Sequence, residues 1–220
     1  MSERRKLSAD AILFDSDETL VSSIKSVLRC WSRWADAHGL TVAEIMSVQP
    51  HGRPAAAIVA DLLPAEEVAM ALALLEQAEV DDAAAGGVLP VPGALELLAS
   101  LPPDRWAVVT SGTRRVADAR LAAAGVRAAH VITVDDITRH KPDPEPFLVA
   151  AGRLGAAPSR CIAFEDAPAG LSAARAAGMT TVAVTTTHKA DDLEADMVIP
   201  DLSAVTARAT HAGVELTIAG

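Results

Sequence analysis

The chain has 220 residues, which suits one core domain that carries a small insertion. Half of the residues are hydrophobic, so a sizeable core can be buried. The formal net charge of -10 argues against a nucleic-acid partner, because no basic stripe offsets it. No apolar run approaches the roughly 20 residues of a membrane span, and the N-terminal run is too short for a signal peptide. We therefore expect a cytoplasmic protein with no membrane partner.

The first predicted element is a strand over residues 11–14, an unbroken apolar run that is typical of a strand buried on both faces of a parallel sheet. Asp15 follows it, and Asp17 comes one residue later. In parallel α/β sheets the carboxyl ends of the strands open onto the ligand crevice. A carboxylate there can attack an electrophile, a second can transfer a proton, and both can help to hold a divalent cation. Taken alone, the pair also fits a solvated turn or a helix cap.

The segment that follows has helical patterns and no strand pattern. A helical block at this point interrupts the sheet topology, so we interpret residues 23–87 as a small all-helical cap domain inserted after the first strand. Residues 1–22 and 88–220 then form the core domain, with hinges at residues 21–23 and 86–93. The predicted cap helices cover residues 23–38, 54–63 and 65–80.

His51 and Arg53 lie in a turn of the predicted cap, just before a helix that begins near Pro54. This loop could close over the site and contact the part of a substrate that does not react. Arg53 suits a hydroxyl-rich or anionic ligand. A polar loop that does no more than start a helix is the alternative.

Beyond the cap, apolar runs alternate with helical stretches. A glycine follows each of the three predicted helices, as is usual at helix C-termini. Strands that alternate with helices predict a doubly wound, Rossmann-like parallel sheet, and therefore an α/β fold. The predicted strands cover residues 106–109, 130–133, 161–164, 181–184 and 197–199, and the predicted helices cover residues 114–124, 146–154 and 168–177.

Three further strand ends carry groups that suit an anionic ligand and a metal. Ser111 and Gly112 follow the second strand and open a helix, so a hydroxyl and a backbone N–H can donate to phosphate. Lys141 lies in the proline-rich loop beyond the third strand and could balance negative charge. Glu165 and Asp166 follow the fourth strand and could complete a magnesium site with the first aspartate pair. Helix caps or solvated charges explain each group singly, but four strand ends together favour a functional site.

Four segments, in this order, resemble the signature motifs of the haloacid dehalogenase-like (HAD) superfamily: FDSDETL, VVTSGT, HKPDPEPF and FEDAPAG. The similarity spans about residues 10 to 200. HGRPAAAIV, LPVPGALELLASLP and RWAVVTSGTR resemble a narrower group, the capped sugar-phosphate and glycerol-phosphate phosphatases of that superfamily. The resemblance implies hydrolysis of small phosphate monoesters.

By position, the resemblance implies that Asp15 is the nucleophile and becomes an aspartyl phosphate. Asp17 would protonate the leaving alcohol and then activate the water that hydrolyses the intermediate. Mg²⁺ is the implied cofactor, with Asp15, Asp17 (through its carbonyl), Glu165 and Asp166 as the metal site.

The resemblance also implies a set of substrate contacts. Ser111 and Gly112 would bind the phosphate, and Lys141 would stabilise its negative charge. His51 and Arg53 would contact the rest of the substrate. We expect a small sugar or polyol phosphate such as glycerol phosphate, because a small cap must close around the ester. We expect a monomer or a small homo-oligomer.

Three alternatives stay open. Glu18 stands where the capped sugar phosphatases usually have glycine, so the chain could be a catalytically impaired ligand-binding protein; we expect an active enzyme in which Glu18 points away from the phosphate. A β-phosphoglucomutase-like phosphomutase is the second alternative. The related mutases have a histidine in the first cap helix, whereas the nearest positions here, Val27 and Leu28, cannot transfer protons, so hydrolysis is favoured. A phosphonate hydrolase would need a cap lysine, and Lys25 is the one lysine of the insertion.

Overall fold

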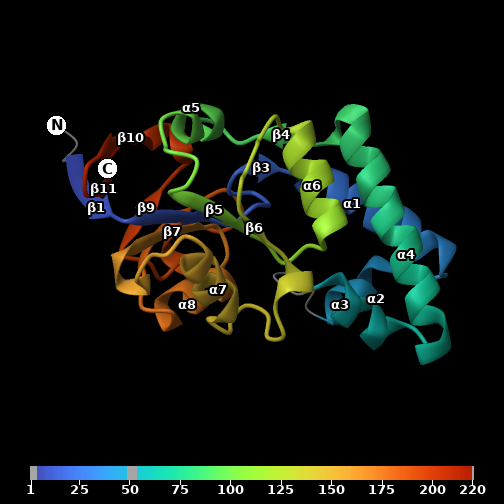
Figure 1. Cartoon of the computed structure of the whole chain (residues 1–220). Coiled ribbons are helices and arrows are strands. Elements are labelled where there is room, and N and C mark those ends of the chain that lie inside the picture. Colours follow the sequence, from blue (N-terminus) through green and yellow to red (C-terminus); the bar gives the residue numbers. More distant parts are fainter. Residues whose placement is uncertain (1–3, 49–53, 220) are drawn as a thin grey trace.

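The computed structural model describes residues 4–48 and 54–219 and contains the predicted parallel sheet (Figure 1). Its six strands lie in the order β6-β5-β2-β7-β8-β9, and all neighbours are parallel. The first strand of the sequence pattern, β2, is therefore central, as a doubly wound α/β fold requires. The strands are β2 (Ala11–Phe14), β5 (Trp106–Val109), β6 (Val131–Ile132), β7 (Cys161–Glu165), β8 (Thr180–Val184) and β9 (Met197–Ile199).

Helices cover both faces of this sheet, which explains the unbroken apolar runs of its strands. Ile12 and Phe14 pack on the face covered by α5 and α6, whereas Ala11 and Leu13 pack on the face covered by α7 and α8. The Phe14 ring stacks on Phe164 of β7, with 5.1 Å between the ring centroids. The covering helices are α5 (Ala94–Ala99), α6 (Arg114–Ala123), α7 (Glu145–Arg153) and α8 (Pro168–Ala176).

The segment between the first two strands of the parallel sheet is helical, as predicted, and lies beside the sheet (Figure 1). It has a small apolar core of its own, in which Trp34, Val59 and Leu75 are buried. The Trp34 indole N–H donates to the carbonyl of Ala71 at 3.0 Å, so its polar atom is satisfied in this core. The helices are α1 (Ile24–Ala37), α2 (Val42–Ser47), α3 (Ala55–Leu62) and α4 (Ala65–Asp82), and α4 runs into a π-helical turn, η1 (Ala83–Gly87).

The chain passes into and out of this cap at adjacent points. β3 (Val21–Ser22) pairs antiparallel with β4 (Leu89–Pro90), so the two passages form a short ribbon. The ribbon coincides with the two predicted hinges. The domain boundaries after residues 22 and 87 stay a prediction.

A three-stranded antiparallel sheet, absent from the prediction, lies at the end of the molecule opposite the cap (Figure 1). In β11, the side chains of Val214, Leu216 and Ile218 are buried in the main core, and the residues between them are more exposed. Among the described residues, no helix combines the length and the apolarity that crossing a bilayer requires. The new strands are β1 (Arg4–Ala9), β10 (Val205–Thr210) and β11 (Gly213–Ala219), and short 3-10 turns are η2 (Val134–Asp136), η3 (Pro158–Arg160), η4 (Ala190–Asp192) and η5 (Leu202–Ala204).

Candidate active site

Parallel pairing of β2 with β7 brings three carboxylates together. Asp15 follows β2, and its backbone N–H donates to the carbonyl of Phe164 at 2.9 Å, which fixes it beside the end of β7. Glu165 ends β7 and Asp166 follows. One oxygen from each of the three carboxylates lies within 4.8 Å of the others, and all three residues are buried. Three of the four residues of the predicted metal site therefore lie together.

Lys141 supplies the positive charge of this cluster. Its Nζ donates to Asp15 Oδ1 at 2.6 Å, to Glu165 Oε1 at 2.8 Å and to the carbonyl of Val109 at 2.9 Å. The three donors of the ammonium are all used, so its position is fixed. Burial alone would lower the pKa of Lys141, but Asp15 and Glu165 together raise it above its ordinary value. The lysine therefore stays charged.

The charges of this cluster do not balance. Three buried carboxylates against one ammonium leave two negative charges uncompensated. Burial raises the pKa of Asp15 well above its ordinary value, although the Lys141 ammonium opposes the shift. Burial also raises the pKa of Asp166 to about 7, and repulsion from Glu165 adds to it. Buried oxygen donors that lack a counter-charge are the donor set that a hard divalent cation such as Mg²⁺ prefers.

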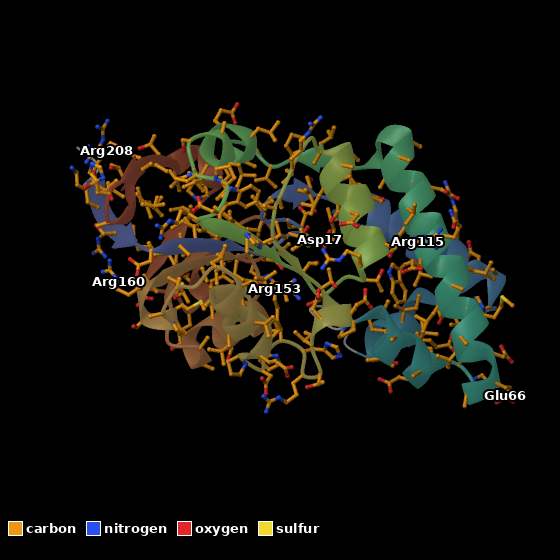
Figure 2. All side chains as sticks on the ribbon, in the orientation of Figure 1. Asp17, Glu66, Arg115, Arg153, Arg160 and Arg208 are labelled. Atoms are coloured by element: carbon orange, nitrogen blue, oxygen red, sulfur yellow. The ribbon has the colours of Figure 1, made fainter. Side chains whose placement is uncertain are left out.

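The carboxylate of Asp17 lies outside this cluster. Its Oδ1 accepts hydrogen bonds from Ser23 Oγ at 2.6 Å and from Arg120 Nη1 at 2.9 Å. Asp17 lies where the sheet meets the cap (Figure 2). Its carboxylate is not part of the carboxylate group described above, so a metal contact through its backbone carbonyl stays a prediction.

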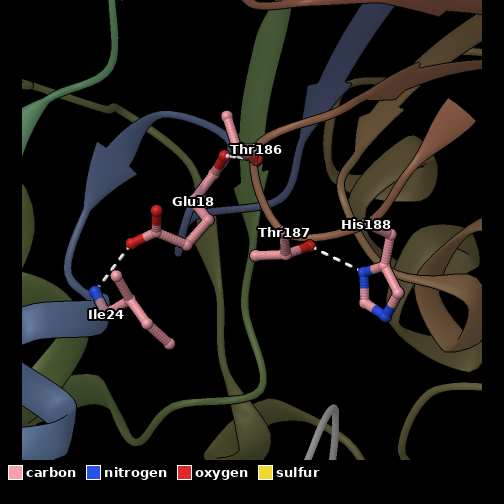
Figure 3. Close-up of a pocket in the computed structure, with 5 residues that line it drawn as sticks. All are labelled: Glu18, Ile24, Thr186, Thr187 and His188. Atoms are coloured by element: carbon pink, nitrogen blue, oxygen red, sulfur yellow. Dashed lines mark hydrogen bonds between the residues drawn. The ribbon is translucent and has the colours of Figure 1, made fainter.

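Glu18 has a left-handed backbone, with φ of 61°. This conformation costs a residue with a Cβ roughly 1–2 kcal/mol, which explains why glycine suits the position. The Glu18 Oε1 accepts from the backbone N–H groups of Ser23 and Ile24, each at 2.6 Å, at the start of α1, and Figure 3 shows the bond from Ile24. A carboxylate is stabilised at a helix N-terminus, so Glu18 acts as the cap of α1. Glu18 also lines the cleft, and its pointing away from the phosphate stays a prediction.

Substitutions at Glu18 should separate the cap from the backbone strain. Glu18→Ala is expected to lower the free energy of unfolding by about 1–2 kcal/mol, because the helix cap is lost and the left-handed backbone stays. Glu18→Gly loses the same cap but relieves the backbone, so it should be about 1 kcal/mol more stable than the alanine variant. Urea denaturation measures both values. An alanine variant as stable as the wild type would show that this carboxylate does not cap α1.

Ser111 and Gly112 lie at the end of β5, where α6 begins. Both line the same cleft as the acidic cluster and Lys141. The Gly112 N–H already donates to the hydroxyl of Thr110 at 3.1 Å, whereas Ser111 makes no hydrogen bond among the described residues. The predicted role of Ser111 in binding phosphate therefore needs no rearrangement, and that of Gly112 requires the Thr110 bond to open.

The cleft between core and cap has a volume of about 770 Å³. Its floor is polar and carries the residues described above, whereas its cap side is largely apolar. His51 and Arg53 lie outside the described residues, so their predicted contacts stay predictions. The apolar lining of the cap side includes Ile24, Val27, Leu28, Trp31, Leu72 and Leu75.

Two residues after β8 support Asp166, and the sequence pattern does not reveal them. The Thr187 hydroxyl donates to Asp166 Oδ2 at 2.5 Å, and His188 Nδ1 lies 3.1 Å from the Asp166 carbonyl oxygen. Thr187 and His188 also line a smaller hollow of about 310 Å³ together with Glu18 (Figure 3). Both residues belong to the loop after β8, and this loop has no sequence motif that would predict their contact with the site.

Gly170 makes room for Glu165. The Glu165 Oε2 accepts from the backbone N–H groups of Asp166 at 2.9 Å and Ala167 at 3.0 Å, which places this carboxylate against the first turn of α8. A Cβ on residue 170 would overlap the carboxylate. The single glycine of the FEDAPAG segment is therefore required by close approach of a side chain, not by its own backbone conformation.

We expect Gly170→Ala to lower kcat about 10²-fold, because it displaces Glu165 and with it Lys141. Gly152→Ala is the matched control, since this helical glycine in α7 has open space around its Cβ position. That control should keep full activity and gain about 0.5–1 kcal/mol of unfolding free energy. Steady-state kinetics and thermal unfolding of both variants measure these effects. Full activity in Gly170→Ala would contradict the packing argument.

The family model of the haloacid dehalogenase-like hydrolases matches residues 9–178. The chain therefore belongs to this family. A hydrolase from Pseudomonas syringae has a similar crystal structure, with a TM-score of 0.78 and 26% identity over 89% of this chain and 94% of that one.

Two curated relatives narrow the class of enzyme. Hexitol phosphatase A of Escherichia coli (strain K12) is 37% identical over 201 residues, which cover 88% of this chain and 92% of that protein. Glycerol-1-phosphate phosphohydrolase 2 of Saccharomyces cerevisiae (strain ATCC 204508 / S288c) is 33% identical over 202 residues, which cover 86% of this chain and 79% of that protein. With this membership and these relatives, the chain is a phosphoric monoester hydrolase.

Proposed function

We propose that the protein is a magnesium-dependent phosphatase that hydrolyses small sugar or polyol phosphates through an aspartyl phosphate. The observation that carries this proposal is the buried Asp15, held at the end of β2 by Lys141 and placed beside Asp166. A carboxylate fixed in this way can act as a nucleophile. Folding has already supplied the entropic cost of orienting it, so that cost does not add to the barrier of the reaction.

Each group of the cluster has a separate task in this proposal. The two oxygens of Glu165 already accept from Lys141 and from the start of α8, so Glu165 mainly holds the lysine in place. Asp15 and Asp166 would then be the main carboxylate ligands of Mg²⁺. When bound, the ion would supply positive charge next to the phosphoryl oxygens. Lys141 stabilises negative charge on the transferring group, and Ser111 donates to it.

Asp17 acts as the general acid and base. It lines the cleft, two residues from the nucleophile, and its carboxylate lies outside the metal group. It would give a proton to the leaving alcohol and later take one from the attacking water. The phosphoryl group moves from the ester oxygen to an Asp15 oxygen in the first step, and from that oxygen to water in the second.

The substrate class is inferred from the relatives and from the cleft. Relatives named for hexitol phosphates and glycerol 1-phosphate favour a sugar or polyol ester. A cleft of about 770 Å³ has room for a hexitol chain as well as for glycerol. A mutase is not favoured, since Val27 and Leu28 line the cleft at the positions nearest to the histidine of the related mutases. A phosphonate hydrolase is not favoured either, since Lys25 is exposed and is not among the described residues that line the cleft. Cytoplasmic location and a monomeric or small oligomeric state stay predictions.

The direct test measures inorganic phosphate released from glycerol 1-phosphate, a hexitol 6-phosphate and glucose 6-phosphate. We expect turnover with Mg²⁺ and its loss with a chelator, followed by recovery when Mg²⁺ is restored. Full activity in the chelator would overturn the metal requirement. If none of the three esters released phosphate, the proposed activity would be overturned.

A further inference from the structure

Arg120 of α6 is a buried cation that none of the roles above uses. Its side chain is 8% exposed, and it bridges one carboxylate that follows β2 and one from the cap. The Nη1 lies 2.9 Å from Asp17 Oδ1, and the Nη2 lies 3.1 Å from Glu79 Oε1. Glu79 belongs to α4 of the cap and is also buried. A single charged network therefore joins the cap to the residue proposed as acid and base.

The two oxygens of the Asp17 carboxylate have different surroundings. Ser23 Oγ and Arg120 Nη1 both donate to Oδ1. Among the described residues no donor contacts Oδ2, and Asp17 lines the cleft. Two donors therefore occupy Oδ1, and Oδ2 is the oxygen left open toward a substrate or a water in the cleft.

Glu79 in turn holds Arg120. The Nε of Arg120 is buried without a hydrogen-bond partner among the described residues, so the guanidinium is oriented by its two carboxylates. Burial raises the pKa of Glu79, and Arg120 opposes that shift. A buried guanidinium that lost one carboxylate would be costly, because its charge would stay partly uncompensated.

We propose that Arg120 is a positioning residue that orients Asp17 for proton transfer, and that Glu79 makes this orientation depend on the packing of α4 against α6. The inference rests on the proposed function, since it assigns Asp17 the acid role. It goes beyond that function because a cap residue then controls the protonation geometry of a core residue.

The same helix interface offers a matched control. Thr113 Oγ1 donates to Glu76 Oε1 at 2.5 Å, and Arg115 Nη1 lies 3.3 Å from Glu76 Oε2. Arg115 lies on α6 and faces α4 (Figure 2). These contacts join the same two helices without contacting Asp17. Arg115→Gln therefore removes a charged contact between cap and core and leaves the acid and base untouched.

The test compares two leaving groups by kcat/KM, which for a phosphoenzyme mechanism reports steps up to release of the alcohol. Glycerol phosphate needs a proton on its leaving alkoxide, whereas 4-nitrophenolate leaves without one. We expect Arg120→Gln to lower kcat/KM about 10²-fold for glycerol phosphate and less than about threefold for 4-nitrophenyl phosphate. Glu79→Gln should show a smaller loss with the same selectivity, Arg120→Lys should recover part of it, and Arg115→Gln should lose nothing on either ester.

An equal loss on both esters would overturn the proposal, because a purely structural role of Arg120 lowers both. Thermal unfolding shows whether Arg120→Gln folds. If it does not fold, Glu79→Gln tests the proposal through the same comparison of the losses in kcat/KM on glycerol phosphate and on 4-nitrophenyl phosphate. Failure of the proposed function is distinct, because the wild type would then hydrolyse neither ester.

Discussion

Asp15→Asn is expected to lower turnover of phosphate esters by at least about 10⁴-fold, because an amide cannot form the phosphorylated intermediate. The fold should persist. Asparagine has nearly the same shape, and the change removes one of three buried carboxylates that repel one another. Without metal, the free energy of unfolding should fall by less than about 1 kcal/mol, since reduced repulsion offsets the weakened contact with Lys141.

Two measurements check this prediction. Phosphate release gives the loss of activity, and urea denaturation in a chelator gives the stability. The rise in melting temperature on adding Mg²⁺ should also shrink in Asp15→Asn, because a metal ligand is lost. Asp104→Asn, which changes an exposed aspartate of the core domain, is the control and should match the wild type in activity and stability. Retained activity in Asp15→Asn would rule out Asp15 as the nucleophile.

Lys141→Met should be the most destabilising change in the site. The Lys141 side chain is 5% exposed and contacts both Asp15 and Glu165, so its removal leaves two buried carboxylates without their cation. Breaking a buried pair from one side typically costs about 3–5 kcal/mol. Activity should fall at the same time, because no fixed cation then faces the transferring group.

Denaturation and activity measurements on Lys141→Met with and without Mg²⁺ separate the loss of stability from the loss of activity. The divalent ion should restore part of the lost stability, since it compensates the same carboxylates, but it should not restore activity. Lys189→Met is the control, because Lys189 is exposed. A metal-free Lys141→Met protein that loses less than about 1 kcal/mol would contradict the charge imbalance on which the metal assignment depends.

The parallel sheet could be predicted because its strands are buried on both faces and leave unbroken apolar runs such as β2 and β7. The same reasoning placed Asp15, Lys141 and Asp166 at one edge, since strand ends in such a sheet converge. The terminal sheet was missed, although the alternation of β11 is a usable period-two signal. The pairing of β1 with β11 joins distant parts of the chain, and no local pattern specifies it.

The contacts that refine the site depend on long-range geometry. In the sequence, Arg120 is not distinguished from an exposed charge on an amphipathic helix. Its role depends on its contact with Glu79 of α4, which only the structure shows. Gly170 is part of a motif, but the sequence does not explain why glycine is needed there. The explanation is the Glu165 carboxylate, which occupies the place of a Cβ at residue 170. The sequence shows that Glu18 replaces a glycine beside the site, but it does not show that the carboxylate accepts hydrogen bonds from the start of α1 or that the backbone is left-handed.

The ribbon formed by β3 and β4 has a consequence for how such enzymes diversify. Because the chain leaves the core and returns to it at neighbouring positions, any inserted segment whose ends meet can be accommodated there without disturbing the parallel sheet. The entropic penalty for a longer insertion is small, about 0.6 kcal/mol for each doubling of its length. Asp15, Lys141 and Asp166 lie outside the inserted segment, so under the proposed function an exchanged insertion would leave these groups in place. It would supply its own surface toward the alcohol, and it would have to replace the contact that Glu79 makes with Arg120 in this chain.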